Sequence, residues 1–333
     1  MARRNWKLLE ASAGLRLEDW EQGSTREGWS ARLQTLRGGL REGVQLLTLN
    51  NGVISVAVIP TRGLNLWKIR RGETEFGWKS PIAGPVHPQF VPIAEPSGLG
   101  FLDGFDELLA RCGLESNGAP EFAENGRLLW PLHGRISNKP AHRLEVFHDA
   151  EAGEIGFIGE VDETRFHLTK LRLTSRVTLK LGEPELRIDD EILNLSDSPA
   201  GCQLLYHLNL GEPLLEAGAE VLAPVDTLVP RNAWAREGLG EWSRYPEPEP
   251  GRAEQVYFLK LRADERGWAS TLLRNASGSM GVQFDYDTAT LPCFSLWKNP
   301  TGRADGYVTG LEPATNFPNP RSFEEQQGRV VQL

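Results

Sequence analysis

Residues 170–181 read Lys-Leu-Arg-Leu-Thr-Ser-Arg-Val-Thr-Leu-Lys-Leu, and this alternating stretch decides the fold. The odd-numbered residues of 171–181 are apolar except Ser175, whereas the even-numbered ones are Arg, Thr or Lys. A two-residue period is typical of a β-strand with one buried and one solvated face. The alternation resumes at Leu186 after the breaker Gly182-Glu183-Pro184, so we expect two long antiparallel strands joined by a short turn.

Shorter runs of this kind occur along most of the chain, separated by Gly and Pro. One of the few helix signals is 104–113, which we expect to form a single short helical turn. The pattern therefore predicts an all-β protein, a large antiparallel β-sandwich or barrel. We expect 1–333 to be a single domain with 1–42 as an N-terminal extension or edge strands, and the Pro-rich stretch 245–251 to be a surface insertion. Further strands are expected at 44–49, 53–59, 64–69, 154–161, 202–206, 256–261, 281–286 and 294–298.

The composition excludes several classes of protein. The 333 residues include 36 Lys and Arg against 45 Asp and Glu, a net charge of −9, so nucleic acid and anionic membranes are not expected partners. Cys112, Cys202 and Cys293 are widely spaced, which disfavours a disulfide framework and a zinc site. No run approaches the roughly 20 apolar residues of a membrane helix, and no signal peptide is evident. We therefore expect a soluble cytoplasmic protein with reduced thiols.

Three short segments hold polar groups that the strand pattern does not explain. His133 and Arg135 flank a Gly within 130–140, which suits a loop at a functional site. His207 lies at the end of a strongly apolar strand, where burial would tune the pKa of its imidazole. Glu312 follows an expected strand and precedes a rigid turn rich in Pro and Asn, which would hold its carboxylate in place.

These segments, in this order, resemble the galactose mutarotase-like (aldose 1-epimerase) superfamily, and most closely its branch known as a domain of unknown function. The motifs are His133-Gly134, Tyr206-His207 and Leu311-Glu312-Pro313, and the resemblance extends from about Gly52 to the end of the chain. It implies the large β-sandwich of that superfamily, its supersandwich. Mutarotases carry Asn where this chain has Tyr206, and this difference leaves the identity of the sugar open.

The resemblance implies a mutarotase that interconverts the α and β anomers of a free monosaccharide. Ring opening needs a base to take the proton of the O1 hydroxyl and an acid to protonate the ring oxygen. Glu312, expected to be ionised, suits the base and a protonated His207 suits the acid, with the roles exchanged on ring closure. His133 would orient the sugar and stabilise charge at the ring oxygen. Such a reaction requires no metal and no redox cofactor.

Further side chains are candidates for binding the sugar. The resemblance places Arg111 where mutarotases have an Arg that binds sugar hydroxyls, and convergence of Arg62, Arg111 and Arg135 would favour an acidic sugar. Indole rings stack on the apolar face of a pyranose, which makes Trp297 a candidate wall. The alternative, purely structural roles are surface ion pairs for the arginines and core packing for the tryptophan. The expected substrate-binding set is Arg111, Arg135, Arg62, His87, Asn209 and Trp297.

Two other functions remain open at this stage. The same fold can serve a carbohydrate-binding or sensor protein without turnover, and related sandwiches also occur in polysaccharide lyases and glycoside hydrolases. A hydrolase needs a second carboxylate, for which Asp103, Asp106 and Glu115 are the candidates. The sequence also leaves open whether the chain is a monomer or a homodimer.

Overall fold

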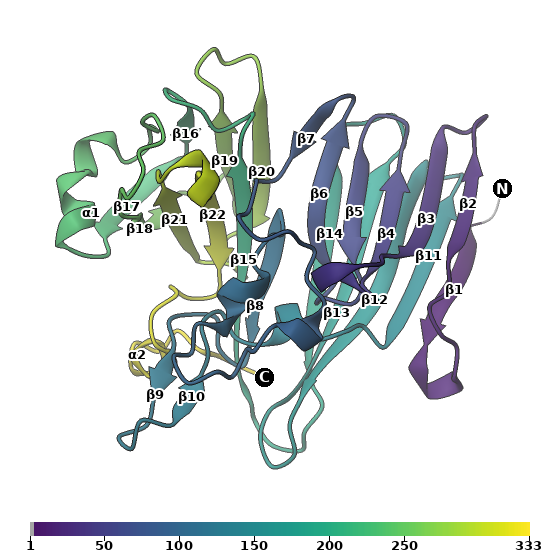
Figure 1. The fold of residues 1–333 in the computed structure, drawn as a ribbon, viewed down its shortest axis with the longest axis horizontal. Coiled ribbons are helices and arrows are strands. Elements are labelled where there is room, and N and C mark those ends of the chain that lie inside the picture. Colours follow the sequence, from purple (N-terminus) through teal and green to yellow (C-terminus); the bar gives the residue numbers. More distant parts are fainter. Residues whose placement is uncertain (1–2) are drawn as a thin grey trace.

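Three β-sheets and a small two-stranded ribbon form the framework of this computed structural model, which describes residues 3–333 (Figure 1). The large sheet runs across the whole molecule, and the two smaller sheets pack on the same side of it at opposite ends. In strand order the large sheet contains β17 (Val225–Pro230), β18 (Gln255–Leu261), β21 (Cys293–Asn299), β22 (Val308–Ala314), β15 (Gly201–Gly211), β8 (Leu109–Leu114), β6 (Asn65–Arg71), β5 (Ser55–Ile59), β4 (Gln45–Asn50), β3 (Trp29–Thr35) and β2 (Trp20–Ser24), with β23 (Val331–Gln332) on β15 and β7 (Thr74–Phe76) on β6.

The smaller sheets are antiparallel as well. The five-stranded sheet contains β1 (Arg4–Glu10), β11 (Arg143–Asp149), β12 (Glu154–Thr164), β13 (Lys170–Lys180) and β14 (Leu186–Asn194). The three-stranded sheet contains β16 (Glu220–Leu222), β19 (Trp268–Arg274) and β20 (Gly281–Asp287), and β9 (Glu121–Phe122) pairs with β10 (Leu128–Trp130). The prediction of an all-β antiparallel sandwich is therefore confirmed.

Helices are few and short. The α-helices are α1 (Ala233–Glu237) and α2 (Arg321–Gln326). The 3₁₀ helices are η1 (Ala11–Ala13), η2 (Gly39–Arg41), η3 (Pro88–Phe90), η4 (Gly100–Gly104), η5 (Ile136–Asn138), η6 (Leu239–Glu241) and η7 (Arg303–Asp305). Within residues 3–333, none of the helices has the length and apolar character needed to cross a bilayer.

The hydrophobic core has two main parts, both on one side of the large sheet. In the first, Leu47 and Val58 of the large sheet pack with Phe157 and Leu173 of the five-stranded sheet. In the second, β15, β18 and β21 pack against the three-stranded sheet. The opposite side of the large sheet is covered over its centre by the loop between β7 and β8, which includes η3 and η4. The central strands are consequently buried on both faces.

The hairpin expected from residues 170–192 is present as β13 and β14. Leu173 lies opposite Ile192 and Val177 lies opposite Ile188, so the apolar residues of the two strands share one face. The strand expected at 202–206 is longer than expected, because β15 continues through His207 to Gly211.

The expectation of a helical turn over 104–113 is wrong. Residues Gly100–Gly104 form η4, and Leu109–Leu114 form strand β8, in which all six residues are buried. Because β8 pairs with β15 and is covered on both faces, it needs no polar side. A segment of only six residues is too short for its period to distinguish a buried strand from a short helix.

A buried ion pair joins the large sheet to the five-stranded sheet. Arg111 of β8 donates to Asp190 of β14 from Nε at 2.6 Å, and the two side chains are 0% and 1% exposed. Arg111 also donates to Ser175 Oγ, and the hydroxyl of Tyr206 donates to Asp190. Ser175, the polar exception in the alternating stretch, thus meets a polar partner inside the sandwich.

Replacing Arg111 by Met should destabilise the protein strongly, because Asp190 would remain buried without its cation. We expect a loss of about 3–5 kcal/mol in the free energy of unfolding, measured by urea denaturation. The matched control is Arg187→Met, which breaks an exposed Arg–Asp pair whose side chains are 74% and 41% exposed. The control should cost at most about 1 kcal/mol. Equal losses in the two variants would contradict a structural role for the buried pair.

Candidate active site

Four neighbouring strands, β8, β15, β22 and β21, form the floor of the candidate site. Along β15, Leu204, Leu208 and Leu210 point into the sandwich core. The alternation of a strand therefore places His207 and Asn209 on the opposite face, under the loop between β7 and β8. In register, Asn209 and Trp297 both lie opposite Gly310 of the intervening strand β22.

His207 and Glu312 form the centre of this face. His207 Nε2 lies 3.2 Å from Glu312 Oε1, and the two side chains are 5% and 3% exposed. We expected Glu312 to follow a strand, but it lies inside β22, a strand that is paired on both sides, and it is itself opposite Ser295 of β21.

Gly310 makes the close approach of these groups possible. A Cβ atom at Gly310 would lie 2.6 Å from Glu312 Oε1, 2.9 Å from His207 Cε1 and 3.1 Å from Trp297 Cε3. Any larger residue would displace at least one of the three side chains, because contacts under 3.0 Å are too short for a Cβ atom.

The orientation of His207 is set from below by Asn209. The Nδ2 group of Asn209 donates hydrogen bonds to the carbonyl oxygens of Glu107 and His207. Its Oδ1 therefore faces His207 and accepts a hydrogen bond from His207 Nδ1 at 2.6 Å. This fixes the tautomer of a neutral imidazole, with Nε2 unprotonated and facing Glu312.

His133 lies beside His207, with the two ring centroids 5.2 Å apart. Its backbone has a φ of 58°, a left-handed conformation, and the carbonyl oxygen of Asn117 accepts from its Nδ1 at 3.0 Å. Phe101 packs edge-on against His133 and Phe105 against His207, each at centroid distances of 5.0 to 5.1 Å. The structure thus brings His133, His207 and Glu312, separated by up to 179 residues in sequence (312 − 133 = 179), into one cluster.

Trp297 borders the same cluster. Its ring centroid lies 5.4 Å from that of His207 and 6.2 Å from that of Phe105, and the side chain is half-buried. Its indole N–H donates to Glu254 Oε2 at 2.6 Å. Trp297 is therefore placed as a wall of the site.

Burial changes the protonation of the central pair. Burial, followed by the nearby charge of Glu254, raises the pKa of Glu312 to about 8. Burial, followed by the proximity of His133, lowers the pKa of His207 well below its ordinary value. Both directions favour a neutral pair, a protonated Glu312 beside an unprotonated His207 Nε2. We expected an ionised Glu312 beside an imidazolium, so the two groups have exchanged their expected protonation states. In both forms the pair holds one proton between Glu312 and His207 Nε2.

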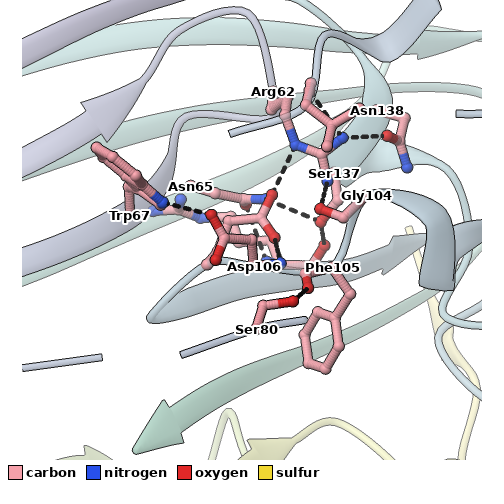
Figure 2. Close-up of polar contacts among 12 residues, drawn as sticks. Arg62, Asn65, Trp67, Ser80, Gly104, Phe105, Asp106, Ser137 and Asn138 are labelled. Atoms are coloured by element: carbon pink, nitrogen blue, oxygen red, sulfur yellow. Dashed lines mark hydrogen bonds and ion pairs between the residues drawn. The ribbon is translucent and has the colours of Figure 1, made fainter. Parts of the chain in front are cut away.

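Arg62, which we expected as a sugar ligand, has structural partners instead. Its side chain is fully buried, donates to Glu107 Oε1 at 2.7 Å and to Asn138 Oδ1 at 2.7 Å, and also reaches the carbonyl oxygens of Val86 and Gly104. Figure 2 shows this network, in which Arg62 lies next to Asn138 and close to Gly104.

The same network holds the loop that covers the site. In Figure 2, Trp67 donates to Asp106 and Ser80 donates to the carbonyl oxygen of Phe105. Glu107, which receives Arg62, offers its carbonyl oxygen to Asn209. Arg62 thus supports the site from behind, because it fixes the loop on which His207 and its partner Asn209 depend.

Two further expected sugar ligands have structural partners instead. Arg111 is fully buried on the sandwich side of β8, where Asp190 and Ser175 occupy its guanidinium. Asn209 is also fully buried, and its amide is used to orient His207. The expected convergence of Arg62, Arg111 and Arg135 around an acidic sugar is therefore absent from the residues that the structure describes.

Arg135 and His87 lie outside the cluster as far as the contacts of residues 3–333 show. Burial, and then the charge of Arg165, lowers the pKa of the half-buried Arg135, and the carboxylates that act on it are Glu163 and Glu115. His87 accepts a hydrogen bond from the Gln89 amide at its Nδ1 and packs edge-on against Phe90.

The acidic residues considered for a hydrolase also have other partners. Asp106 accepts from Trp67 Nε1 at 2.7 Å, and Glu115 pairs with Arg165 at 3.6 Å. Asp103 lies exposed in η4.

Sequence reasoning missed four residues of the site: Phe101, Phe105, Glu254 and Gly310. The sequence could have indicated Gly310, because residues two apart on a strand share a face and Gly310 lies two residues before Glu312. Phe101 lies 32 residues before His133 (133 − 101 = 32) and Phe105 lies 102 residues before His207 (207 − 105 = 102), and nothing in the sequence connects them, or Glu254, with these histidines.

Replacing Gly310 by Ala should displace Glu312 or His207 while the protein still folds, because the added methyl group would lie under 3.0 Å from both side chains. The matched control is Gly240→Ala, where a methyl group meets nothing within 4 Å. The NMR signals of the His207 ring report the displacement, and circular dichroism reports the fold. Ring signals that are unchanged in the Gly310 variant would contradict this description of the floor.

Glu312 should make stability depend on pH. Its pKa is about 8 when folded against 4.5 when exposed, so between these values the folded chain holds one more proton and its stability falls as the pH rises. Glu312→Gln removes this titration. The free energy of unfolding of the wild type, relative to that of the variant, should therefore fall from pH 5 to pH 8 by up to about 1.4 kcal/mol per pH unit.

Urea denaturation at intervals across this range measures the difference, and Glu247→Gln, at a side chain that is 76% exposed, serves as the matched control. A difference between wild type and Glu312→Gln that stays constant from pH 5 to pH 8 would show that Glu312 is not held protonated.

One similar structure is also similar in sequence, whereas several others share only the fold. A protein from Klebsiella pneumoniae subsp. pneumoniae, proposed to be an aldose 1-epimerase, is 34% identical, with a TM-score of 0.95 over 100% of this chain and 88% of that one. A galactose mutarotase-like protein from Clostridium acetobutylicum is 12% identical, with a TM-score of 0.58 over 95% and 94% of the two chains. A protein from Escherichia coli K12, also proposed to be an aldose 1-epimerase, is 13% identical, with a TM-score of 0.51 over 87% and 94%.

The fold is therefore the galactose mutarotase-like sandwich, as the resemblance implied. No curated protein matches the sequence. The family model described as Domain of unknown function (DUF4432) matches residues 41–333. Because this match spans most of the sequence, the chain belongs to the DUF4432 family of the galactose mutarotase-like superfamily.

Proposed function

We propose that this protein is an aldose 1-epimerase, a cofactor-independent mutarotase that interconverts the α and β anomers of a free monosaccharide. The observation that carries the proposal is the buried His207–Glu312 pair, 3.2 Å apart, with one proton shared between them. The likeness to the Klebsiella protein, which is itself proposed to be an aldose 1-epimerase, supports the same reaction class.

The neutral pair supplies both groups that ring opening requires. Glu312 in its protonated form donates to the ring oxygen of the sugar, while the unprotonated Nε2 of His207 accepts the proton of the O1 hydroxyl. The ring C–O bond breaks as the aldehyde forms, and after this step Glu312 is a carboxylate and His207 an imidazolium. Rotation about C1–C2 and ring closure reverse both transfers, so the pair returns to its resting state without a net change.

Burial suits this cycle because it holds the pair in the neutral form between turnovers. The pKa shifts of Glu312 and His207 each favour the uncharged form, so Glu312 keeps its proton and His207 Nε2 stays free to accept one before the sugar binds. In the open-chain intermediate the two opposite charges lie within ion-pair distance and stabilise each other.

His133 and Trp297 would bind and orient the sugar. Because Asn117 holds the Nδ1–H of His133, its Nε2 is available to accept from a sugar hydroxyl. The face of Trp297 would stack on the apolar C–H groups of the ring. The hypothesis of an acidic sugar loses support, because Arg62 and Arg111 are occupied in the core.

The test is polarimetry on freshly dissolved α-anomers of several aldoses, with wild type, Glu312→Gln and His207→Gln. We expect each variant to lose at least about 100-fold in rate, because it removes a group that donates or accepts a proton in the transition state. The matched control is His142→Gln, whose imidazole pairs with Asp162 away from the cluster.

The alternative of a carbohydrate-binding protein makes a different prediction. If no aldose mutarotates faster with the wild type, yet one of them raises its melting temperature, the mutarotase proposal fails and a binding role replaces it.

A further inference from the structure

A row of side chains continues outward from the His207–Glu312 pair across three more strands. Trp297 of β21 lies opposite Val256 of β18, and the backbone N–H of Arg231, just after β17, donates to the carbonyl oxygen of Val256. Glu254 lies two residues before Val256 and therefore shares the face of the sheet that carries Trp297.

Glu254 uses both of its oxygens within this row. Its Oε2 accepts from the indole N–H of Trp297 at 2.6 Å, and its Oε1 accepts from Arg231 Nη2 at 2.7 Å. Hydrogen bonds to an ionised carboxylate are short and comparatively strong. Glu254 therefore connects the indole N–H of Trp297 to Arg231, a cation just beyond the end of β17.

The inner parts of the Trp297 ring are held differently. The ring lies over the gap left by Gly310, and its neighbours His207 and Phe105 make only ring contacts with it. Such contacts are weakly directional. The hydrogen bond from the indole N–H to Glu254 therefore sets the rotation of the half-buried ring.

This arrangement contributes little to stability. The side chains of Glu254 and Arg231 are each 42% exposed, and exposed ion pairs are worth little in folding. A partly exposed acid placed between a site tryptophan and an arginine is better explained by a role in the site.

We propose that Glu254 is a positioning residue, which holds Trp297 at the angle needed to stack on the sugar and is itself held by Arg231. This inference rests on the proposed function for its substrate, a free monosaccharide. Loss of Glu254 should weaken sugar binding more than it slows the chemical step, because Trp297 touches the sugar but transfers no proton.

The test compares kcat and KM for Glu254→Ala, Glu254→Gln and Trp297→Phe on the aldose that the wild type turns over fastest. At pH 6, Glu254→Ala should raise KM about tenfold and leave kcat within about threefold of wild type, because burial is the larger cause of the raised pKa of Glu312 and keeps that group protonated there without the charge of Glu254. Glu254→Gln keeps an oxygen acceptor for the indole N–H and should recover most of the loss in KM. In the Trp297→Phe background, Glu254→Ala should have no further effect on KM, because the hydrogen bond that it removes is already absent.

The matched control is Glu249→Ala, which removes an exposed acid of the same segment that pairs with Arg252 and has no contact with Trp297 among residues 3–333. Its KM should equal that of the wild type. Independent, additive effects of Glu254→Ala and Trp297→Phe would overturn the proposal, as would a KM for Glu254→Ala within twofold of the control.

A measurement without turnover separates this inference from the proposed function. With 5-fluorotryptophan in place of tryptophan, the ¹⁹F signal of Trp297 is assigned by its loss in Trp297→Phe. It should shift and broaden in Glu254→Ala but not in Glu249→Ala. An unmoved signal overturns the positioning role. If the protein accelerates the mutarotation of no aldose, the proposed reaction alone is overturned.

Discussion

Burial of the four central strands on both faces is the constraint on which the rest of this structure depends. Every residue of β8 and β22 is buried, and β15 and β21 are nearly so. In such strands a polar side chain without a partner inside the protein is costly, because water is excluded. Arg111 meets Asp190 on one face, and Asn209 meets two carbonyl oxygens on the other.

His207 and Glu312 satisfy the same constraint in a way that leaves them reactive. Each has the other as its nearest ionisable partner, and burial opposes the charged form of both. The pair therefore retains one proton that can lie on either side, which is the property that reversible ring opening requires. The environment that makes the strands stable is thus also the one that tunes the candidate catalytic groups.

The supports of the site connect it to the rest of the fold. Arg62 binds Glu107, the carbonyl oxygen of Glu107 receives Asn209, and Asn209 orients His207. On the outer side, Arg231 holds Glu254 and Glu254 holds Trp297. Two arginines that the sequence suggested as ligands for an acidic sugar thus have a different role, because Arg62 pairs with the buried Glu107 and Arg111 pairs with the buried Asp190.

The amino-acid sequence by itself determined the fold class and several of its strands, because a two-residue period is a local property that each stretch such as 170–181 carries alone. The order of the His133, His207 and Glu312 motifs also pointed to the three residues that the structure brings together. The tertiary structure alone decided that 109–114 is a strand, that Arg62 and Arg111 are buried ties, and that Gly310 and Glu254 belong to the site. The physical reason is that burial, partners and pKa values depend on residues far apart in the chain, and no local pattern specifies which distant side chain will lie opposite.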